Sequence, residues 1–189
     1  MNQNEADTED ATPVTTRGGD DGQSGLIDGS RRYKDDIAFE SLGTIDEAQV
    51  ALGCCRAQLR DRDLEPRLQD DLEAVQFLML TAGGVMACPV DSPPVSGQPV
   101  ITQADILRLE EHIAGWKKRV ELEPRFFVAG DTIVGAEFDR ARTVVRRAER
   151  AVVRVVRMQG LEEQKTVSRF LNRLSDWLFI VARWADSQE

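Results

Sequence analysis

The chain has 189 residues, which is enough for one domain with a substantial hydrophobic core. Its 24 basic and 33 acidic side chains give a net charge of −9, which argues against a general nucleic-acid-binding protein, since such proteins carry an excess of Lys and Arg. No apolar run approaches the roughly 20 residues that a membrane-spanning helix needs. The polar, acidic first residues match neither a secretory signal nor an Arg-rich transit peptide, so we expect a cytoplasmic protein.

The glycine-rich segment 15–32 is the first candidate for a ligand-binding element. It holds five of the 14 glycines together with Asp, Ser and Thr, and clustered backbone amides beside hydroxyl groups and a basic residue are suited to binding phosphate. It is not a Walker A loop, because the spacing GxxxxGK[ST] is absent. The alternative is a flexible segment that continues the disordered acidic tail expected at residues 1–14. We expect residues 15–187 to form a single domain.

From residue 36 onward, apolar residues recur at intervals of three and four, which predicts helices. No alternating strand pattern competes with them, and the four prolines of segment 89–101 indicate a surface connection. Thr102 and Asp105 are spaced as a capping box before the third helix. The fold class predicted is all-α, a five-helix bundle of the ferritin-like up-and-down type. Its apolar stripes fall at 45–59, 68–82, 106–120, 134–158 and 163–186.

The arginine-rich fourth helix is the second candidate. One flank beside its expected core face carries Arg142, Arg146 and Glu149. Two arginines one turn apart, followed by a carboxylate, can hold a polyphosphate and a ribose hydroxyl. The alternative is a solvated face tied together by Arg–Glu pairs. The expected core face consists of Ala141, Val145, Ala148, Val152 and Val155, and the opposite flank of Arg140, Arg147 and Arg154.

The other reactive residue types are interpreted as structural. His112 is the only histidine, and without a second histidine or a cysteine pair at ligand spacing no metal site is predicted. Cys54, Cys55 and Cys88 are expected to be small core or near-core residues.

Four segments, in this order, resemble the PduO-type ATP:corrinoid adenosyltransferases. They are TTRGGDDGQSG, RRYKDDIAFESLGTIDE, RARTVVRRAERAVV and FLNRLSDWLFIVARWA, and the similarity covers residues 15–186. In that family a five-helix bundle assembles as a homotrimer, with ATP and corrinoid bound between subunits. The resemblance implies transfer of the 5′-deoxyadenosyl group of ATP to cob(I)alamin, giving adenosylcobalamin and triphosphate. It also implies magnesium on the phosphates, and as partners a corrinoid reductase and an adenosylcobalamin-dependent enzyme, with no nucleic acid and no membrane.

The resemblance also assigns roles to residues. Arg146 and Lys34 match the family's phosphate contacts, and Asp46 and Arg142 match a salt bridge between subunits. Phe126 matches the aromatic residue that displaces the lower axial ligand of the corrinoid, which makes four-coordinate cob(II)alamin easier to reduce. The remaining nucleotide contacts implied are Thr16, Arg17, Gly18, Gly19, Ser24 and Gly25 in the loop, with Glu149, Arg150 and Asn172 on the last two helices.

The sequence departs from the family pattern at three places. Gly18 replaces a threonine, Asp21 replaces a cation close to the phosphates, and residues 128–131 replace the usual LPGG. Because the arginine helix, Lys34 and Asn172 are intact, we expect an active adenosyltransferase. The alternative is a catalytically impaired paralogue that binds corrinoid or nucleotide as a carrier or sensor. A third interpretation, a helical scaffold without ligand, requires both arginine flanks to be solvated surface.

Overall fold

The computed structural model describes residues 15–62, 64–88, 97–124, 126–159 and 162–188. The tail expected at residues 1–14 and the helix end expected at Gly160 lie outside the described residues. Two short strands precede five helices in the part that is described. These elements are β1 (Gln23–Gly25), β2 (Arg31–Tyr33), α1 (Ile37–Asp61), α2 (Pro66–Met86), α3 (Gln103–Lys117), α4 (Ile133–Gln159) and α5 (Glu162–Asp186).

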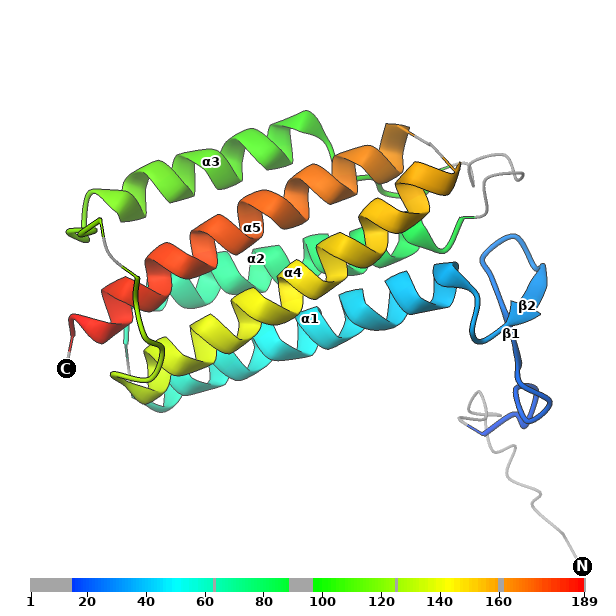
Figure 1. The fold of residues 1–189 in the computed structure, drawn as a ribbon, viewed down its shortest axis with the longest axis horizontal. Coiled ribbons are helices and arrows are strands. Elements are labelled where there is room, and N and C mark those ends of the chain that lie inside the picture. Colours follow the sequence, from blue (N-terminus) through cyan, green and yellow to red (C-terminus); the bar gives the residue numbers. More distant parts are fainter. Residues whose placement is uncertain (1–14, 63, 89–96, 125, 160–161, 189) are drawn as a thin grey trace, which may run out of the picture.

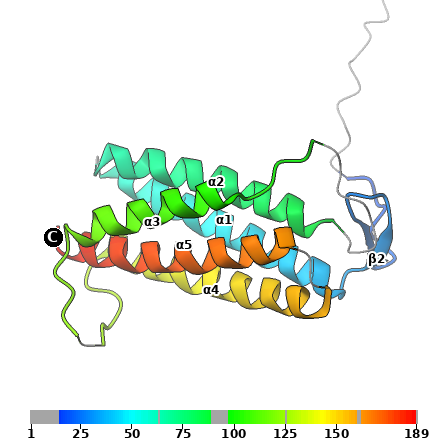
Figure 2. The same cartoon turned by 90° about the horizontal axis from the view of Figure 1, so that it is seen from above.

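The helices form the predicted bundle (Figure 1). The long helix α4 packs against both α5 and α1, α2 packs against α1, and α3 lies on the outer side of α5 (Figures 1 and 2). Asp36 caps α1 by accepting a hydrogen bond from the backbone N–H of Ala38 at 2.8 Å. The capping box of Thr102 and Asp105 is present at the start of α3, as predicted.

The core is one cluster to which all five helices contribute, and α4 packs in it between α5 and α1. Phe138 of α4 and Phe170 and Trp177 of α5 are fully buried in this core, and burial of aromatic side chains is a large part of the hydrophobic stabilisation. The core face predicted for α4 is confirmed, since all five residues named for it are buried. The polar flanks of α4 are therefore left at the surface, where ligands can reach them.

The glycine-rich segment is not a simple loop, which corrects the interpretation of residues 15–32 as loop or flexible chain. β1 and β2 form an antiparallel hairpin in which Ser24 faces Arg32. Its turn is closed by a hydrogen bond from the backbone N–H of Leu26 to the carbonyl oxygen of Ser30 at 2.8 Å, with Gly29 at a φ of 82°. The hairpin could not be predicted from the sequence because its strands have three residues each, too few to show an alternating pattern.

Figure 1 shows the hairpin at the end of the bundle where α1 begins and α4 ends. The chain's last described residues lie at the opposite end. Within the described ranges, no helix has the length and apolarity that a membrane span requires.

Candidate functional site

A surface pocket of about 430 Å³ lies between α3, α4 and α5. Arg142 and Arg146 line it from α4, and Lys117 and Asp176 add one further charge of each sign. Its apolar wall consists of Ile113, Leu122, Phe179 and Ile180. The pocket therefore combines cationic groups with an apolar surface, which suits a ligand that has anionic and apolar parts.

The two arginines of this pocket differ in how they are held. The Nε of Arg142 donates to Oδ1 of Asp139 at 2.9 Å, which fixes the orientation of its side chain. Arg146 is exposed, and within the described part of the chain its guanidinium has no ion-pair or hydrogen-bond partner. Arg150, one turn further on, donates from Nη1 to the carbonyl oxygen of Arg146 at 3.2 Å. Arg146 is thus a cation available to an anionic ligand.

Glu149 and Asn172 are brought together from different helices. The amide Nδ2 of Asn172 on α5 donates to Oε1 of Glu149 on α4 at 3.0 Å. The amide oxygen of Asn172 accepts from Nη1 of Arg173 at 2.7 Å, and Arg173 is held in turn by Glu110 of α3 at 2.8 Å. This chain of contacts sets the orientation of Asn172 beside the polar flank of α4.

The glycine loop folds over β2 and the residue after it. Lys34 donates from Nζ to the carbonyl oxygen of Gly19 at 2.8 Å. The backbone N–H of Lys34 donates to the carbonyl oxygen of Gly22 at 2.9 Å. A guanidinium nitrogen of Arg31 contacts the carbonyl oxygen of Gly18 and lies 3.7 Å from the carboxylate of Asp21. Lys34 therefore belongs to the loop structure, and the carboxylate of Asp21 has its own counter-ion in Arg31.

The other predicted loop positions lie in the same unit. Thr16 accepts a hydrogen bond from the backbone N–H of Gly18 through Oγ1 at 3.4 Å. Arg17 has a φ of 57°, in the left-handed region. Ser24 and Gly25 lie in β1.

One chain does not bring the loop and the arginine pocket together. Arg146 precedes the end of α4 by 13 residues, which is about 20 Å of helix, whereas the hairpin lies beyond that end (Figure 1). Asp46 is exposed on α1, and Arg142 is bound by Asp139 of its own chain. The two halves of the predicted nucleotide site are therefore separate within the chain.

The adjacent aromatic residues before α4 have opposite environments. Phe126 is fully exposed. Phe127 packs edge-on against Phe179 of α5, with ring centroids 5.8 Å apart, and lies 5.1 Å from the guanidinium carbon of Arg183. Packing of Phe127 thus holds Phe126 out in solvent at the edge of the molecule.

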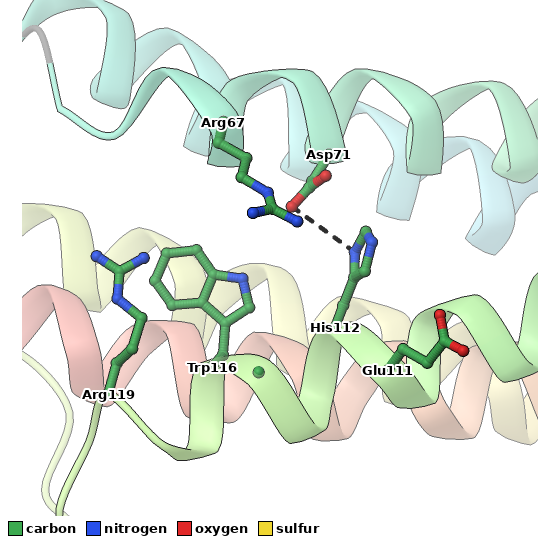
Figure 3. Close-up of a pocket in the computed structure, with 7 residues that line it drawn as sticks. Arg67, Asp71, Glu111, His112, Trp116 and Arg119 are labelled. Carbon is green, nitrogen blue, oxygen red and sulfur yellow. Dashed lines mark ion pairs between the residues drawn. The ribbon is translucent and has the colours of Figure 1, made fainter.

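A second pocket, of about 300 Å³, lies between α2 and α3 (Figure 3). Arg67 and Asp71 reach it from α2, and His112 and Trp116 from α3. The Nδ1 of His112 lies 3.7 Å from a carboxylate oxygen of Asp71. None of the predicted site residues lines this pocket.

The described residues contain no group of three or more His, Cys, Asp or Glu side chains that could hold a metal ion. A magnesium ion here fits only as a companion of bound phosphates, because Mg²⁺ is usually held by few protein carboxylates together with substrate phosphates and water.

Sequence reasoning missed the acidic and basic residues that support the site. Asp139 and Arg183 are buried, with 4% and 5% of their surfaces exposed, and Arg31 lies in the hairpin. A buried charged pair has a weak sequence signal, because Asp and Arg on an amphipathic helix are ordinarily read as surface residues. The one available hint was Arg183 inside the apolar run of α5.

Comparison with known proteins identifies the class to which this fold and site belong. A sequence profile described as Cobalamin adenosyltransferase matches residues 14–185. The human corrinoid adenosyltransferase MMAB is 33% identical over 178 residues, covering 93% of this chain and 70% of the human protein. The Bacillus subtilis corrinoid adenosyltransferase is 33% identical over 168 residues, covering 89% of this chain and 83% of that protein.

The solved structures agree. A variant of the PduO-type ATP:corrinoid adenosyltransferase from Lactobacillus reuteri, complexed with cobalamin and ATP, superposes with a TM-score of 0.82 and 29% identity. The match covers 93% of this chain and 94% of the Lactobacillus chain. The protein is thus a helical-bundle protein of the corrinoid-modifying class. It belongs to the cobalamin adenosyltransferase family.

Proposed function

We propose that this protein transfers the 5′-deoxyadenosyl group of ATP to cob(I)alamin, releasing adenosylcobalamin and triphosphate. The observation that carries the proposal is Arg146, whose guanidinium has no partner among the described residues and lies one turn from the fixed Arg142 in a cationic pocket. Membership of the family at 33% identity over most of the chain supports the same activity.

The proposed reaction needs little acid–base catalysis from the protein. The cobalt(I) ion attacks C5′ of ATP, a Co–C bond forms, and the C5′–O bond breaks with its electron pair leaving on triphosphate. The protein therefore contributes orientation and stabilisation of the charge that grows on the leaving group. Arg146 is placed for that second role, with Lys34 and magnesium as further cations on the phosphates.

The nucleotide site is proposed to be shared between subunits of a homotrimer. The loop of one subunit, with Lys34 and residues 16–25, would then meet the α4 flank of its neighbour, with Arg146, Glu149 and Arg150. The separation of about 20 Å along α4 within one chain supports this arrangement. Exposed Asp46 on α1 would pair with Arg142 of the neighbouring subunit across the same boundary.

The corrinoid is proposed to lie against Phe126, whose full exposure leaves its ring available to displace the lower axial ligand. A corrinoid reductase would supply the electron that produces cob(I)alamin. An adenosylcobalamin-dependent enzyme would accept the product.

An anaerobic spectrophotometric assay with chemically reduced cob(I)alamin, ATP and magnesium tests the proposal. We expect turnover in the wild-type protein and a fall of about 100-fold in kcat for Arg146→Ala. Arg108→Ala is the control, since Arg108 is an exposed arginine on α3 that does not line the cationic pocket. Binding of ATP or corrinoid without turnover would instead favour the carrier or sensor function, which the altered residues Gly18, Asp21 and 128–131 raise.

A further inference from the structure

A buried carboxylate receives two arginines from two directions. Asp139 of α4 accepts from Nε of Arg142 at 2.9 Å through Oδ1, and from Nη2 of Arg183 at 2.5 Å through Oδ2. Arg142 lines the cationic pocket beside Arg146, whereas Arg183 comes from the far end of α5. Both oxygens of Asp139 are therefore used, one toward the pocket and one toward α5.

Arg183 connects this carboxylate to the aromatic segment before α4. Its guanidinium carbon lies 5.1 Å from the ring centre of Phe127 and 5.5 Å from that of Phe179. A cation at this distance from aromatic rings is attracted to them. Arg183 therefore helps to fix the position of Phe127, and through it the position of the adjacent Phe126.

The contacts continue to the first turn of α4. Arg183 also pairs with Asp186 at 2.8 Å, and Asp186 accepts from the hydroxyl of Thr132 at 3.1 Å. The same hydroxyl oxygen accepts from the backbone N–H of Gly135 at 2.9 Å. A Cβ at position 135 would overlap the Asp186 carboxylate, so this junction is closely packed. The polar set Thr132, Asp139, Arg142, Arg183 and Asp186 is called the α4–α5 network below.

Stability alone gives a weak reason for such a network. Burying charged groups costs desolvation free energy that their mutual attraction only partly returns, and well-packed apolar residues in their place are often equally stable. An ionic network does have directional contacts, which fix side chains in one arrangement. Here the two groups fixed at its edges are Arg142, which lines the cationic pocket beside Arg146, and the Phe126–Phe127 segment, which is proposed to meet the corrinoid.

We propose that Asp139 and Arg183 are positioning residues that couple the corrinoid-facing segment at Phe126 to Arg142, which lines the cationic pocket beside the proposed phosphate contact Arg146. When ATP binds and holds Arg142 in place, the network also holds Phe126 in the position that binds the corrinoid, and the reverse holds when the corrinoid binds first. ATP and corrinoid therefore strengthen each other's binding. This inference rests on the proposed function, because it needs both ligands to bind. Neither residue touches a substrate; each acts through its neighbour.

Binding measured with one and with both ligands tests the coupling. The dissociation constant of ATP is determined by calorimetry without corrinoid and with saturating cob(II)alamin. For wild-type protein we expect cob(II)alamin to tighten ATP binding by at least about fivefold. In Asp139→Asn, which keeps the side-chain shape but removes the charge, the ratio should fall to within about twofold of unity, while binding of ATP alone changes less than about threefold. Reciprocity requires the same loss when cob(II)alamin is titrated with and without ATP.

Two further variants separate positioning from stability. Arg183→Lys keeps the charge but removes the planar guanidinium that lies near the rings of Phe127 and Phe179, and should lose the coupling as well. Thr132→Val removes only the hydroxyl at the far end of the network, and keeps the test available if Asp139→Asn does not fold. Glu73→Gln is the control, because it breaks the 2.7 Å pair with Arg56 between α1 and α2, away from α4 and α5.

The absorbance spectrum of bound cob(II)alamin is a second readout. It reports loss of the lower axial ligand, which would not change if the network only stabilised the fold. With ATP present, Asp139→Asn should show a smaller fraction of corrinoid that has lost its lower axial ligand, at equal occupancy. The inference is overturned if wild-type protein shows no coupling, or if Asp139→Asn and Arg183→Lys keep it. If the wild-type protein turns over but shows no coupling, only this inference is wrong. If it binds neither ligand, the proposed function is wrong as well.

Discussion

Arg31 and Asp21 face each other in the glycine loop, with 3.7 Å between the guanidinium and the carboxylate. Asp21 is the position where the sequence departs from the family's cation. Arg31, the first residue of β2, supplies a compensating positive charge, and it also contacts the carbonyl oxygen of Gly18.

This pair predicts that Asp21 does little harm to ATP binding. In Asp21→Asn the KM for ATP should change less than about threefold, because exposed ion pairs are worth less than about 1 kcal/mol. Arg31→Ala should raise KM by about tenfold, since it removes a loop cation and frees the Asp21 carboxylate to repel phosphate. Steady-state kinetics with varied ATP measure both. A large gain in ATP affinity for Asp21→Lys would contradict this account and show that the natural loop is compromised.

The hydrogen bond from Asn172 to Glu149 predicts a second effect on nucleotide binding. Asn172→Ala leaves the half-buried Glu149 without its 3.0 Å donor and removes a proposed nucleotide contact. We expect KM for ATP to rise about tenfold, which corresponds to about 1.4 kcal/mol. Asn172→Asp should be worse than Asn172→Ala, because it places a second carboxylate beside Glu149. Thr166→Ala, a change at another half-buried polar residue of α5, serves as the control for helix stability.

Phe126 and Phe127 should respond differently to the same substitution. Phe126→Ala removes an exposed ring, so the free energy of unfolding should stay within about 0.5 kcal/mol of wild type. Phe127→Ala removes the contacts with Phe179 and Arg183 and should cost about 2 kcal/mol. Denaturant titration measures both.

Activity separates the pair as well. Phe126→Ala should slow turnover that starts from cob(II)alamin with a reductant, by about tenfold or more, because the lower axial ligand is then not displaced. Turnover from cob(I)alamin prepared in advance should suffer less. Equal losses from both starting materials would argue against a role for Phe126 in reduction.

The neighbouring cysteines on α1 should differ in reactivity. Cys55 is fully buried, and burial raises the pKa of its thiol far above the ordinary value, with the Glu137 carboxylate adding to the effect. The neutral thiol therefore persists through the whole neutral and mildly alkaline range, whereas Cys54 is exposed. A thiol reagent at pH 8 should label Cys54 rapidly and Cys55 only after unfolding. Cys54→Ser should abolish the rapid phase, and labelling of Cys55 in the folded protein would show that this helix opens locally.

The bundle could be predicted in some detail because helices leave a repeating signal. The apolar stripe of α4 is regular over many turns, so its buried face and the flank with Arg142 and Arg146 followed from spacing alone. The capping box at Thr102 followed from two residue types at the right separation. The hairpin did not, since its pairing depends on backbone hydrogen bonds that any residues can make.

The fold class, the family and the charged residues proposed to contact ligands all followed from the amino-acid sequence. How those charges are paired depends on the three-dimensional structure. Arg142 pairs with Asp139, Arg146 has no partner among the described residues, and Asp21 pairs with Arg31. Periodicity places a residue on a face of one helix, but a partner on another element depends on how the elements pack and on side-chain rotamers. Asp139 and Arg183 are 44 positions apart in sequence and meet only because α4 and α5 run side by side.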